Sequence, residues 1–268
     1  MPIVPLNTET GEIMSGYVMR SPAQQAAARR WLEKKELETL HADSRRWVAA
    51  YQSTIREIAK DLTLAQAGAI IKLLPYMRFK ADGKLINGGK PLKQNEIARI
   101  FKRSRNVTAE ILRELEDLGV INIIKEGRSN SFYISAKFHT IGELNGERFT
   151  KIYVGKLSEV CEDLEINEVG LLYKVLPYFH YSEFYLCSNP NEQQPEKLQH
   201  LDRQGLAEAV GHDVSTVSHL IAKLSAKKVM LSTKSGNSVR YLVHPDLLGR
   251  QRIESEWARS VRKLFEQH

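Results

Sequence analysis

The chain has 268 residues, of which 42% are hydrophobic and 26% charged, a composition typical of folded globular proteins. Lysine and arginine outnumber aspartate and glutamate by 39 to 32, and the resulting net charge of +7 favours a polyanionic partner. The sequence shows no secretory signal and no apolar run near the roughly 18 residues of a membrane span, and its only thiols are Cys161 and Cys187, so we predict a cytoplasmic protein without membrane contact or disulfide framework.

The N-terminal region is predicted to contain a flexible segment over residues 1–20 and a helical arm over residues 21–50. Ser21 is a typical N-cap, and the proline that follows it suits the first helical position. Apolar residues continue at helical spacing past Trp31 and Trp47, so we expect one long helix. Its two tryptophans need cover, which comes either from the rest of this chain or from the same arm of a second copy.

An internal duplication organises the rest of the chain. Residues 74–76, Leu-Pro-Tyr, recur 102 residues later at 176–178. Further along, Leu92 pairs with Leu201, 109 residues later. Since the spacing grows from 102 to 109, the second copy carries 7 extra residues, and the polar stretch 187–195 predicts a surface loop there.

Each copy is long enough to form a domain of its own. We therefore predict a first domain over residues 51–136, a linker over 137–150 and a second domain over 151–248. An amphipathic helix over 249–268 follows, with an apolar stripe that includes Trp257. This helix either covers the second domain or binds a partner. A homodimer through the N-terminal arm or the C-terminal helix is therefore one of the possibilities.

The pattern of the first copy is helix, helix, helix, hairpin. Apolar spacing predicts a first helix over residues 55–76, a short second helix after Pro91 and a third helix that Ser104 caps and Gly119 ends. We expect the third helix to bury Val107, Ile111, Leu115 and Leu118. Two strands around the turn at 126–130 complete the copy.

The second copy repeats this order. Its third helix is expected to bury Val217, Leu220, Ile221 and Leu224. The turn of its hairpin falls at residues 234–238. A helix pair followed by a basic hairpin is the order of a winged helix-turn-helix.

The residues of the first copy also carry a family resemblance. Ile97-Ala98, residues 104–108, Leu115 and residues 118–121 resemble the helix-turn-helix core of winged-helix DNA-binding proteins of the MarR-like and replication-protein kind. The opening Asn-Thr-Glu-Thr-Gly-Glu-Ile is similar to the start of plasmid and phage replication proteins. The resemblance implies a mainly α fold with small β-hairpin wings, an α+β class, as two tandem winged-helix domains with helical N- and C-terminal arms.

The third helix of the first copy presents the chemical groups that read base edges. Arg105 and Arg113 suit guanine, Asn106 suits adenine, and the Ala109 methyl suits thymine. The basic approach to this helix suits phosphates, and the hairpin tip is placed for an adjacent phosphate or the minor groove. The DNA-contacting residues predicted in the first copy are Arg99, Lys102, Arg103, Ser104, Arg105, Asn106, Thr108, Ala109, Arg113, Lys125, Arg128, Ser129 and Asn130.

The second copy departs from this pattern, since Asp213 stands where the first has Ser104, and Val214 where it has Arg105. It either contacts DNA, through phosphates more than base edges, or does not contact DNA. Its candidate DNA-contacting residues are Ser215, Ser218, His219, Lys223, Lys234, Asn237 and Arg240.

These observations predict a sequence-specific double-stranded DNA-binding protein that is not an enzyme. The resemblance implies a plasmid or phage replication initiator that also autoregulates its promoter, with the replication or transcription machinery as further partners. The alternatives are a transcription regulator of a mobile element, and a partition or helicase-recruiting adaptor that uses winged helices to hold protein. No metal, cofactor or catalytic residue is predicted, because no histidine, cysteine or acidic cluster has ligand spacing.

Overall fold

The computed structural model describes residues 21–40 (side chains to Trp31 only), 45–79, 82–127, 129–235, 238–251 and 254–267. The chain divides into two units, the first with residues 1–43 and 252–254, the second with 44–251 and 255–268. In the first unit, helix α1 (Pro22–Leu40) begins after Ser21, whose Oγ accepts a hydrogen bond from the Gln24 amide at 3.2 Å. The predicted flexible segment 1–20 lies outside the described residues.

The expected long arm over 21–50 is wrong in its second half. Helix α1 ends at Leu40, and Trp47–Tyr51 forms strand β1. Four of the five strand residues are buried, and their apolar spacing also fits a helix over so short a run. Antiparallel pairing with strand β7 (Phe149–Tyr153), about a hundred residues away in the sequence, stabilises the strand conformation of these residues.

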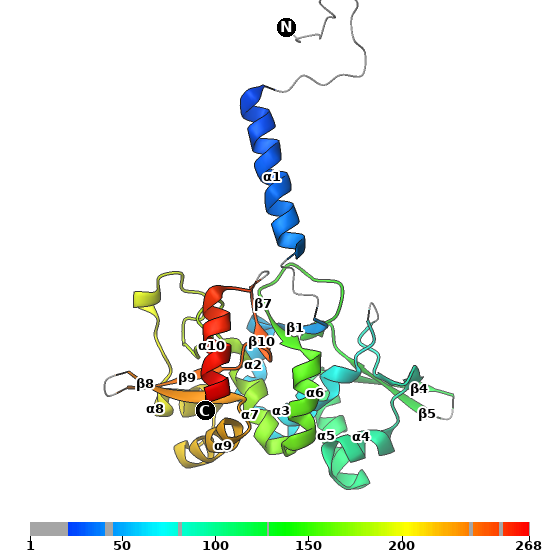
Figure 1. Cartoon of the computed structure of the whole chain (residues 1–268). Helices are drawn as coiled ribbons and strands as arrows, with labels where there is room; N and C mark the ends of the chain where they lie inside the picture. Colours follow the sequence, from blue (N-terminus) through cyan, green and yellow to red (C-terminus); the bar gives the residue numbers. More distant parts are fainter. Residues whose placement is uncertain are drawn as a thin grey trace, which may run out of the picture. The chain divides into compact units, whose positions relative to one another are not determined.

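The second unit consists of two copies of one element series (Figure 1). The first copy contains β1, α2 (Gln52–Ala59), α3 (Leu64–Leu73), η1 (Leu74–Tyr76), β2 (Ile86–Asn87), β3 (Lys90–Pro91), α4 (Gln94–Phe101), α5 (Arg105–Asp117), β4 (Ile121–Glu126), β5 (Ser129–Ile134) and β6 (His139–Thr140). The second contains β7, α6 (Val154–Asp163), α7 (Ile166–Val175), η2 (Leu176–Tyr178), η3 (Pro195–Lys197), α8 (Arg203–Val210), α9 (Val214–Ala226), β8 (Met230–Ser235), β9 (Ser238–Val243) and β10 (Leu248–Gly249). The order of helices and hairpins confirms the mixed α+β class.

The predicted helix over 55–76 is two helices, α2 and α3. Thr63 breaks it, because its side chain accepts a hydrogen bond from the Gln66 amide at 3.2 Å while the Gln66 side chain accepts one from the Thr63 amide at 2.8 Å. This reciprocal pair is a capping box, which satisfies two backbone donors at a helix start.

The two copies pack as one body, not as the two domains joined by a linker that we predicted. Strands β10, β7, β1 and β6 form one sheet in that order, with β1 antiparallel to β7. Ala49 pairs with Lys151 at its centre, 102 residues apart, so a pseudo-twofold axis passes between the copies. The expected linker 137–150 contains β6 and the start of β7.

Helices α3 and α7 cross at this axis through a pair of glycines. A Cβ at Gly68 would lie 1.8 Å from the Ile166 carbonyl oxygen, and one at Gly170 would lie 2.1 Å from that of Leu64. The backbones therefore touch directly, and any side chain at either glycine would force them apart.

Two buried lysines cross the same interface in opposite directions. Lys72, 1% exposed, donates to the carbonyls of Cys161 and Leu164. Lys174, fully buried, donates to Leu62 and contacts His212 Nε2 at 2.9 Å. Desolvation lowers the pKa of Lys72, and it lowers that of Lys174 to about 8. Each ammonium thus satisfies carbonyls at the end of the first helix of the other copy, α6 for Lys72 and α2 for Lys174.

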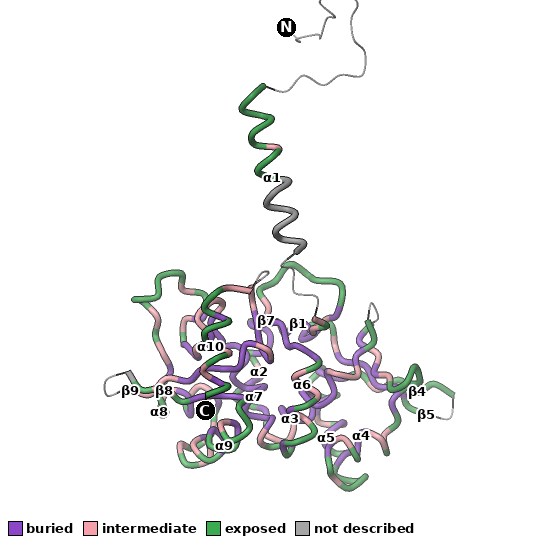
Figure 2. Tube along the Cα trace, viewed as in Figure 1, coloured by how far each residue is buried: buried purple, intermediate pink, exposed green. Residues whose placement is uncertain are grey.

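A single hydrophobic core results from this packing. The buried cluster includes Ile70 and Phe101 of the first copy together with Leu172 and Val210 of the second. Figure 2 shows the buried trace running through the centre of the unit, whereas the outer ends of the two hairpins are exposed.

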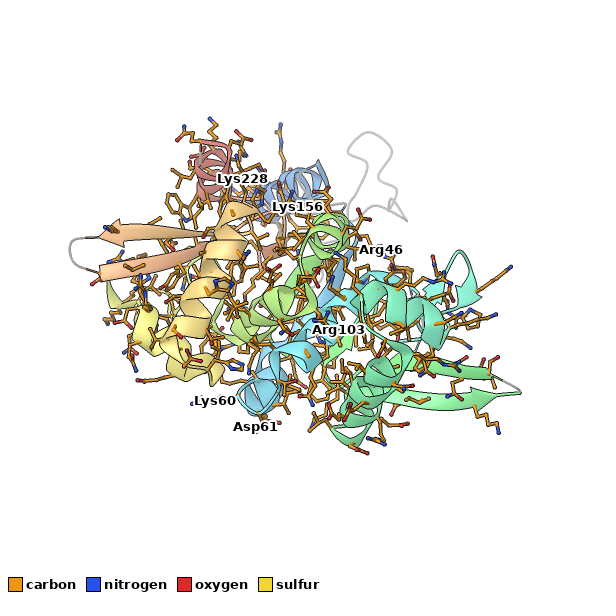
Figure 3. All side chains as sticks on the ribbon, turned by 90° about the horizontal axis from the view of Figure 1, so that it is seen from below. Arg46, Lys60, Asp61, Arg103, Lys156 and Lys228 are labelled. Atoms are coloured by element: carbon orange, nitrogen blue, oxygen red, sulfur yellow. The ribbon has the colours of Figure 1, made fainter. Side chains whose placement is uncertain are left out.

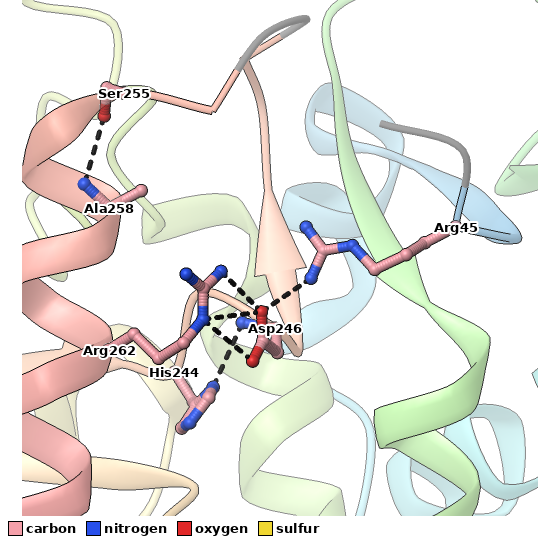
Figure 4. A network of polar contacts seen from close by, with 6 residues as sticks. All are labelled: Arg45, His244, Asp246, Ser255, Ala258 and Arg262. Carbon is pink, nitrogen blue, oxygen red and sulfur yellow. Dashed lines mark hydrogen bonds and ion pairs between the residues drawn. The ribbon is translucent and has the colours of Figure 1, made fainter. Parts of the chain in front are cut away.

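Helix α10 (Glu256–Gln267) covers part of the second copy, one of the two roles expected for it. Its Val261 and Phe265 are buried, and Trp257 donates to the Glu183 carbonyl at 3.2 Å. Asp246 holds this helix by accepting a hydrogen bond from Arg262 Nη2 at 2.7 Å (Figure 4). The same carboxylate accepts a second hydrogen bond from Arg45 Nη1, just before β1, at 2.6 Å.

Candidate nucleic-acid interface

In the first copy, α4 and α5 are joined by a tight turn that fixes the direction of α5. Lys102 at the end of α4 takes a left-handed conformation with φ 52°. Ser104 then caps α5, its side chain accepting from the Val107 amide at 3.4 Å. Gly211 occupies the equivalent turn position of the second copy with φ 70°, so both turns use the same backbone geometry.

The buried face of α5 is rotated from the one we predicted. Thr108, Ile111, Leu112 and Leu115 point inward, whereas Val107 and Leu118 are 41% and 42% exposed. Thr108 is fully buried, so its predicted contact with DNA is wrong. The reason is that Thr108 takes the inward position that Val217 holds in the second copy.

The N-terminal half of α5 presents the predicted reading groups to solvent. Arg105, Asn106 and Ala109 are exposed, and the N-terminal residues of such a helix are those that reach base edges in helix-turn-helix proteins. From Glu110 onward the helix is acidic: Glu110, Glu114, Glu116 and Asp117 flank Arg113 in its sequence. These carboxylates repel phosphates, so the usable surface is the first part of the helix.

Two of the predicted phosphate contacts are held by the other copy. Lys102 Nζ lies 3.5 Å from Glu165 and Arg103 Nη1 lies 3.7 Å from the other oxygen of the same carboxylate. Lys102 also donates to the Glu162 carbonyl at 3.2 Å. Both side chains are partly exposed, so these are surface ion pairs of modest strength, whereas Arg99 on α4 is exposed.

The hairpin β4–β5 is stiffened by one carboxylate. Glu126 accepts from Lys84 Nζ at 2.7 and 2.8 Å, from Ser131 Oγ at 2.8 Å and from the Tyr133 hydroxyl at 2.5 Å. These hydrogen bonds, led by that of Lys84, lower the pKa of Glu126 to about 2. The predicted contacts Lys125, Ser129 and Asn130 are exposed, and Arg128 lies outside the described residues.

The second copy presents a surface of the same form with different chemistry. Asp213 caps α9, accepting from the Thr216 amide at 2.8 Å, and holds the Ser215 hydroxyl at 2.6 Å. Ser218 donates to the Val214 carbonyl at 2.7 Å, so its hydroxyl is used within the helix. His219 and Lys223 are exposed. The sequence of α9 contains no acidic residue, in contrast to α5.

The hairpin of the second copy carries the remaining predicted contacts. Lys234 is exposed and Arg240 is partly exposed, whereas Asn237 lies outside the described residues. As predicted, Val217, Leu220, Ile221 and Leu224 are the buried residues of α9.

The two helix pairs lie on the same face of the second unit. In Figure 1, α4 and α5 lie at the lower right and α8 and α9 at the lower left, with the hairpins pointing outward on opposite sides. Figure 3 views this face directly and places Lys60 and Arg103 on it. The pseudo-twofold axis runs between the two pairs, so they are arranged as in a symmetric dimer, within one chain.

Sequence reasoning missed two residues of this face. Val107, at the start of α5, is exposed beside the reading groups and offers a methyl contact. Lys60, exposed at the end of α2, supplies a cation between the two helix pairs. In the duplication, Val107 aligns with Thr216, a polar and partly exposed residue of α9. This alignment is the sequence signal that indicates an exposed Val107.

No family model matches the chain, and no curated protein does either. No helix among the described residues combines the length and apolarity that crossing a membrane requires. Within the same residues, no three His, Cys, Asp or Glu side chains gather into a possible metal site.

Proposed function

We propose that this chain binds double-stranded DNA sequence-specifically, with α5 and α9 entering the major groove as recognition helices of two winged helix-turn-helix modules. The observation that carries the proposal is the pair of helix–turn–helix–hairpin surfaces on one face, related by a pseudo-twofold axis. Dimeric DNA-binding proteins use the same arrangement, because a twofold axis perpendicular to the duplex places two recognition helices in successive major grooves.

The distribution of charge supports the same proposal. Arg99, Arg105 and Lys125 line the first surface, and Lys223 and Lys234 line the second. Phosphate contacts supply most of the affinity of such proteins, and base contacts supply the specificity. At the positions of Arg105 and Asn106, α9 has Val214 and Ser215. We therefore assign base reading mainly to the first copy and phosphate contact mainly to the second.

The biological role that we favour is initiation of replication on a plasmid or phage, with repression of the protein's own promoter, as the sequence resemblance implies. A transcription regulator of a mobile element uses the same surface, so the two roles differ in the location of the site. An adaptor that holds protein would need neither the basic face nor salt-dependent DNA binding.

Affinity selection of sheared DNA from the host and its mobile elements, at near-physiological salt, tests the proposal. We expect one enriched locus with clustered copies of a site near a replication origin. Enriched promoter fragments alone would replace the initiator role by that of a regulator. Absence of enrichment above the background retained by Arg105→Ala would overturn sequence-specific binding, because that variant lacks the main predicted base contact.

A further inference from the structure

An open hollow of about 330 Å³ lies within the second unit, at the end of the central sheet and beside the inserted loop of the second copy. Binding pockets for small molecules begin at about this size. Its wall includes two guanidinium groups, two aromatic rings, two amides and one carboxylate, from Arg148, Arg250, Phe149, Tyr181, Asn191, Gln193 and Glu147. Nothing in the DNA-binding proposal uses these residues.

The hollow exists because the pseudo-symmetry is broken here. In the first copy, Arg46 donates to the Met77 carbonyl. Arg148 and Phe179 are the equivalent positions, 102 residues on, but Arg250 donates to the Phe179 carbonyl at 3.3 Å instead. Arg148 therefore lines the hollow and is exposed.

The carboxylates near these arginines, including that of Glu147 in the wall of the hollow, accept hydrogen bonds from other groups and form no ion pair with either arginine. Glu147 accepts from Ser53 Oγ and from Asn145 Nδ2, each at 3.0 Å. Glu192 accepts from the Gln193 and Gln194 amides at 2.8 and 3.0 Å. Within the described part of the chain, neither arginine of the hollow has a carboxylate partner.

Arg250 is held in place by hydrogen bonds from both terminal nitrogens of its guanidinium group. Its Nη1 donates to the Pro190 carbonyl at 3.0 Å and its Nη2 to Asn191 Oδ1 at 2.7 Å, while its buried Nε has no hydrogen-bond partner among the described residues. Burial, and then the charge of Arg148, lower the pKa of Arg250 to about 10. Two neighbouring guanidinium groups that form no ion pair among the described residues form a surface that an anion would stabilise.

We propose that this hollow binds a small phosphate monoester of mononucleotide size. The phosphate lies between Arg148 and Arg250, where planar guanidinium groups suit its oxygens. The ring of the ligand packs against Phe149 and Tyr181, and the amides of Asn191 and Gln193 hydrogen-bond its edge. The site belongs to the second copy alone, since the inserted loop and Arg250 have no counterpart in the first.

Isothermal titration of the full chain with AMP, without DNA, tests this inference separately from the proposed function. We expect AMP to bind, adenosine to show no binding at the same concentration, and inorganic phosphate to compete with AMP. Arg148→Ala should weaken AMP binding about 10-fold or more, as expected for a lost charge-assisted hydrogen bond. Because Arg148 is exposed and forms no contact that the fold depends on, this variant should remain folded, which its circular dichroism checks.

Lys197→Ala is the matched control, because it removes a positive charge from the same loop outside the hollow. It should leave AMP affinity unchanged. Absence of AMP binding at millimolar concentration would overturn the inference, as would equal affinity in wild type and Arg148→Ala. The inference would also be overturned if a short DNA duplex displaced AMP and Arg105→Ala abolished AMP binding. These two results together would show that AMP binds at the α5 surface and not in the hollow.

Discussion

At the residue scale, the proposed interface depends on side chains with unequal roles. Arg105 is exposed on the first turn of α5, where its guanidinium would reach base edges in the proposed complex. Lys102 is fixed in the turn before it and shares Glu165 with Arg103. We therefore assign Arg105 to discriminating bases and Lys102 to contacting the phosphate backbone of the DNA.

Replacing these two residues should have different effects on DNA binding. Arg105→Ala should cost about 1–3 kcal/mol on the selected site and relax specificity at one base. Lys102→Ala should weaken all sequences alike and lower the salt slope by about one. Anisotropy titrations over a salt series, with the selected site and single-base variants of it, measure both effects. If neither variant changed DNA binding, the assignment of the first copy as the main reader would be wrong.

The buried imidazole of His139 makes stability depend on pH. Its Nδ1 lies 3.2 Å from the Ala49 carbonyl and its Nε2 lies 3.1 Å from the Tyr173 hydroxyl, and burial lowers its pKa to about 3. The unfolded chain takes up this proton near pH 6.5, whereas the folded chain does not until about pH 3. The contribution of His139 is therefore complete above pH 6.5 and is lost as the pH falls towards 3, at roughly 1.4 kcal/mol for each unit.

Urea unfolding at pH 7 and pH 5 checks this prediction. Wild type should lose about 2 kcal/mol more than His139→Gln between the two values. His219→Gln, a change of the same kind at an exposed position of α9, is the control and should follow wild type. An identical loss in wild type and His139→Gln would contradict the account of this histidine.

At the element scale, the crossing of α3 and α7 joins the two copies. Gly68→Ala should destabilise the protein by about 3 kcal/mol or more, because the new methyl would overlap the Ile166 carbonyl and separate the helices. Gly155→Ala on α6 is the control, since a Cβ there meets nothing within 4 Å. It should be neutral or stabilise by up to about 1 kcal/mol. Chemical denaturation of both variants measures the difference, and equal stabilities would show that the helices tolerate a wider spacing.

Most elements could be predicted from local sequence signals. Ser104 as a cap, Gly119 as a stop and the turn at 126–130 all define elements that the structure confirms, because caps and turns are determined by adjacent residues. Even the break between α2 and α3 had such a signal, in the Thr63 and Gln66 capping box.

The errors have two physical causes. The buried face of α5 was misjudged because Val107 is more hydrophobic than Thr108, although alignment with the buried Val217 of α9 places Thr108 inward. Strand β1 was taken for helix because its partner β7 lies about a hundred residues away, beyond the reach of any local pattern. For the same reason, the hollow at Arg148 and Arg250 could not be predicted from the sequence.

At the scale of the whole molecule, the two copies share a sheet, a helix crossing and one hydrophobic core. We therefore expect the second unit to unfold in one cooperative transition, in contrast to the separate domains that the duplication first indicated. Urea unfolding followed by both far-ultraviolet circular dichroism and tryptophan fluorescence should give coincident curves. Two separated transitions would show that the copies are independent.

The same packing fixes the two proposed recognition surfaces relative to each other. Because a pseudo-twofold axis relates them, their half-sites on DNA should be inverted and unequal in sequence, with centres about one helical turn or a multiple apart.

Hydroxyl-radical footprinting on the selected site shows whether each copy contacts its own half-site. Wild type should protect two backbone patches on one face of the duplex, Arg105→Ala should weaken only one of them, and Lys223→Ala only the other. A single patch, or two patches that both respond equally to Arg105→Ala, would contradict the assignment of one half-site to each copy.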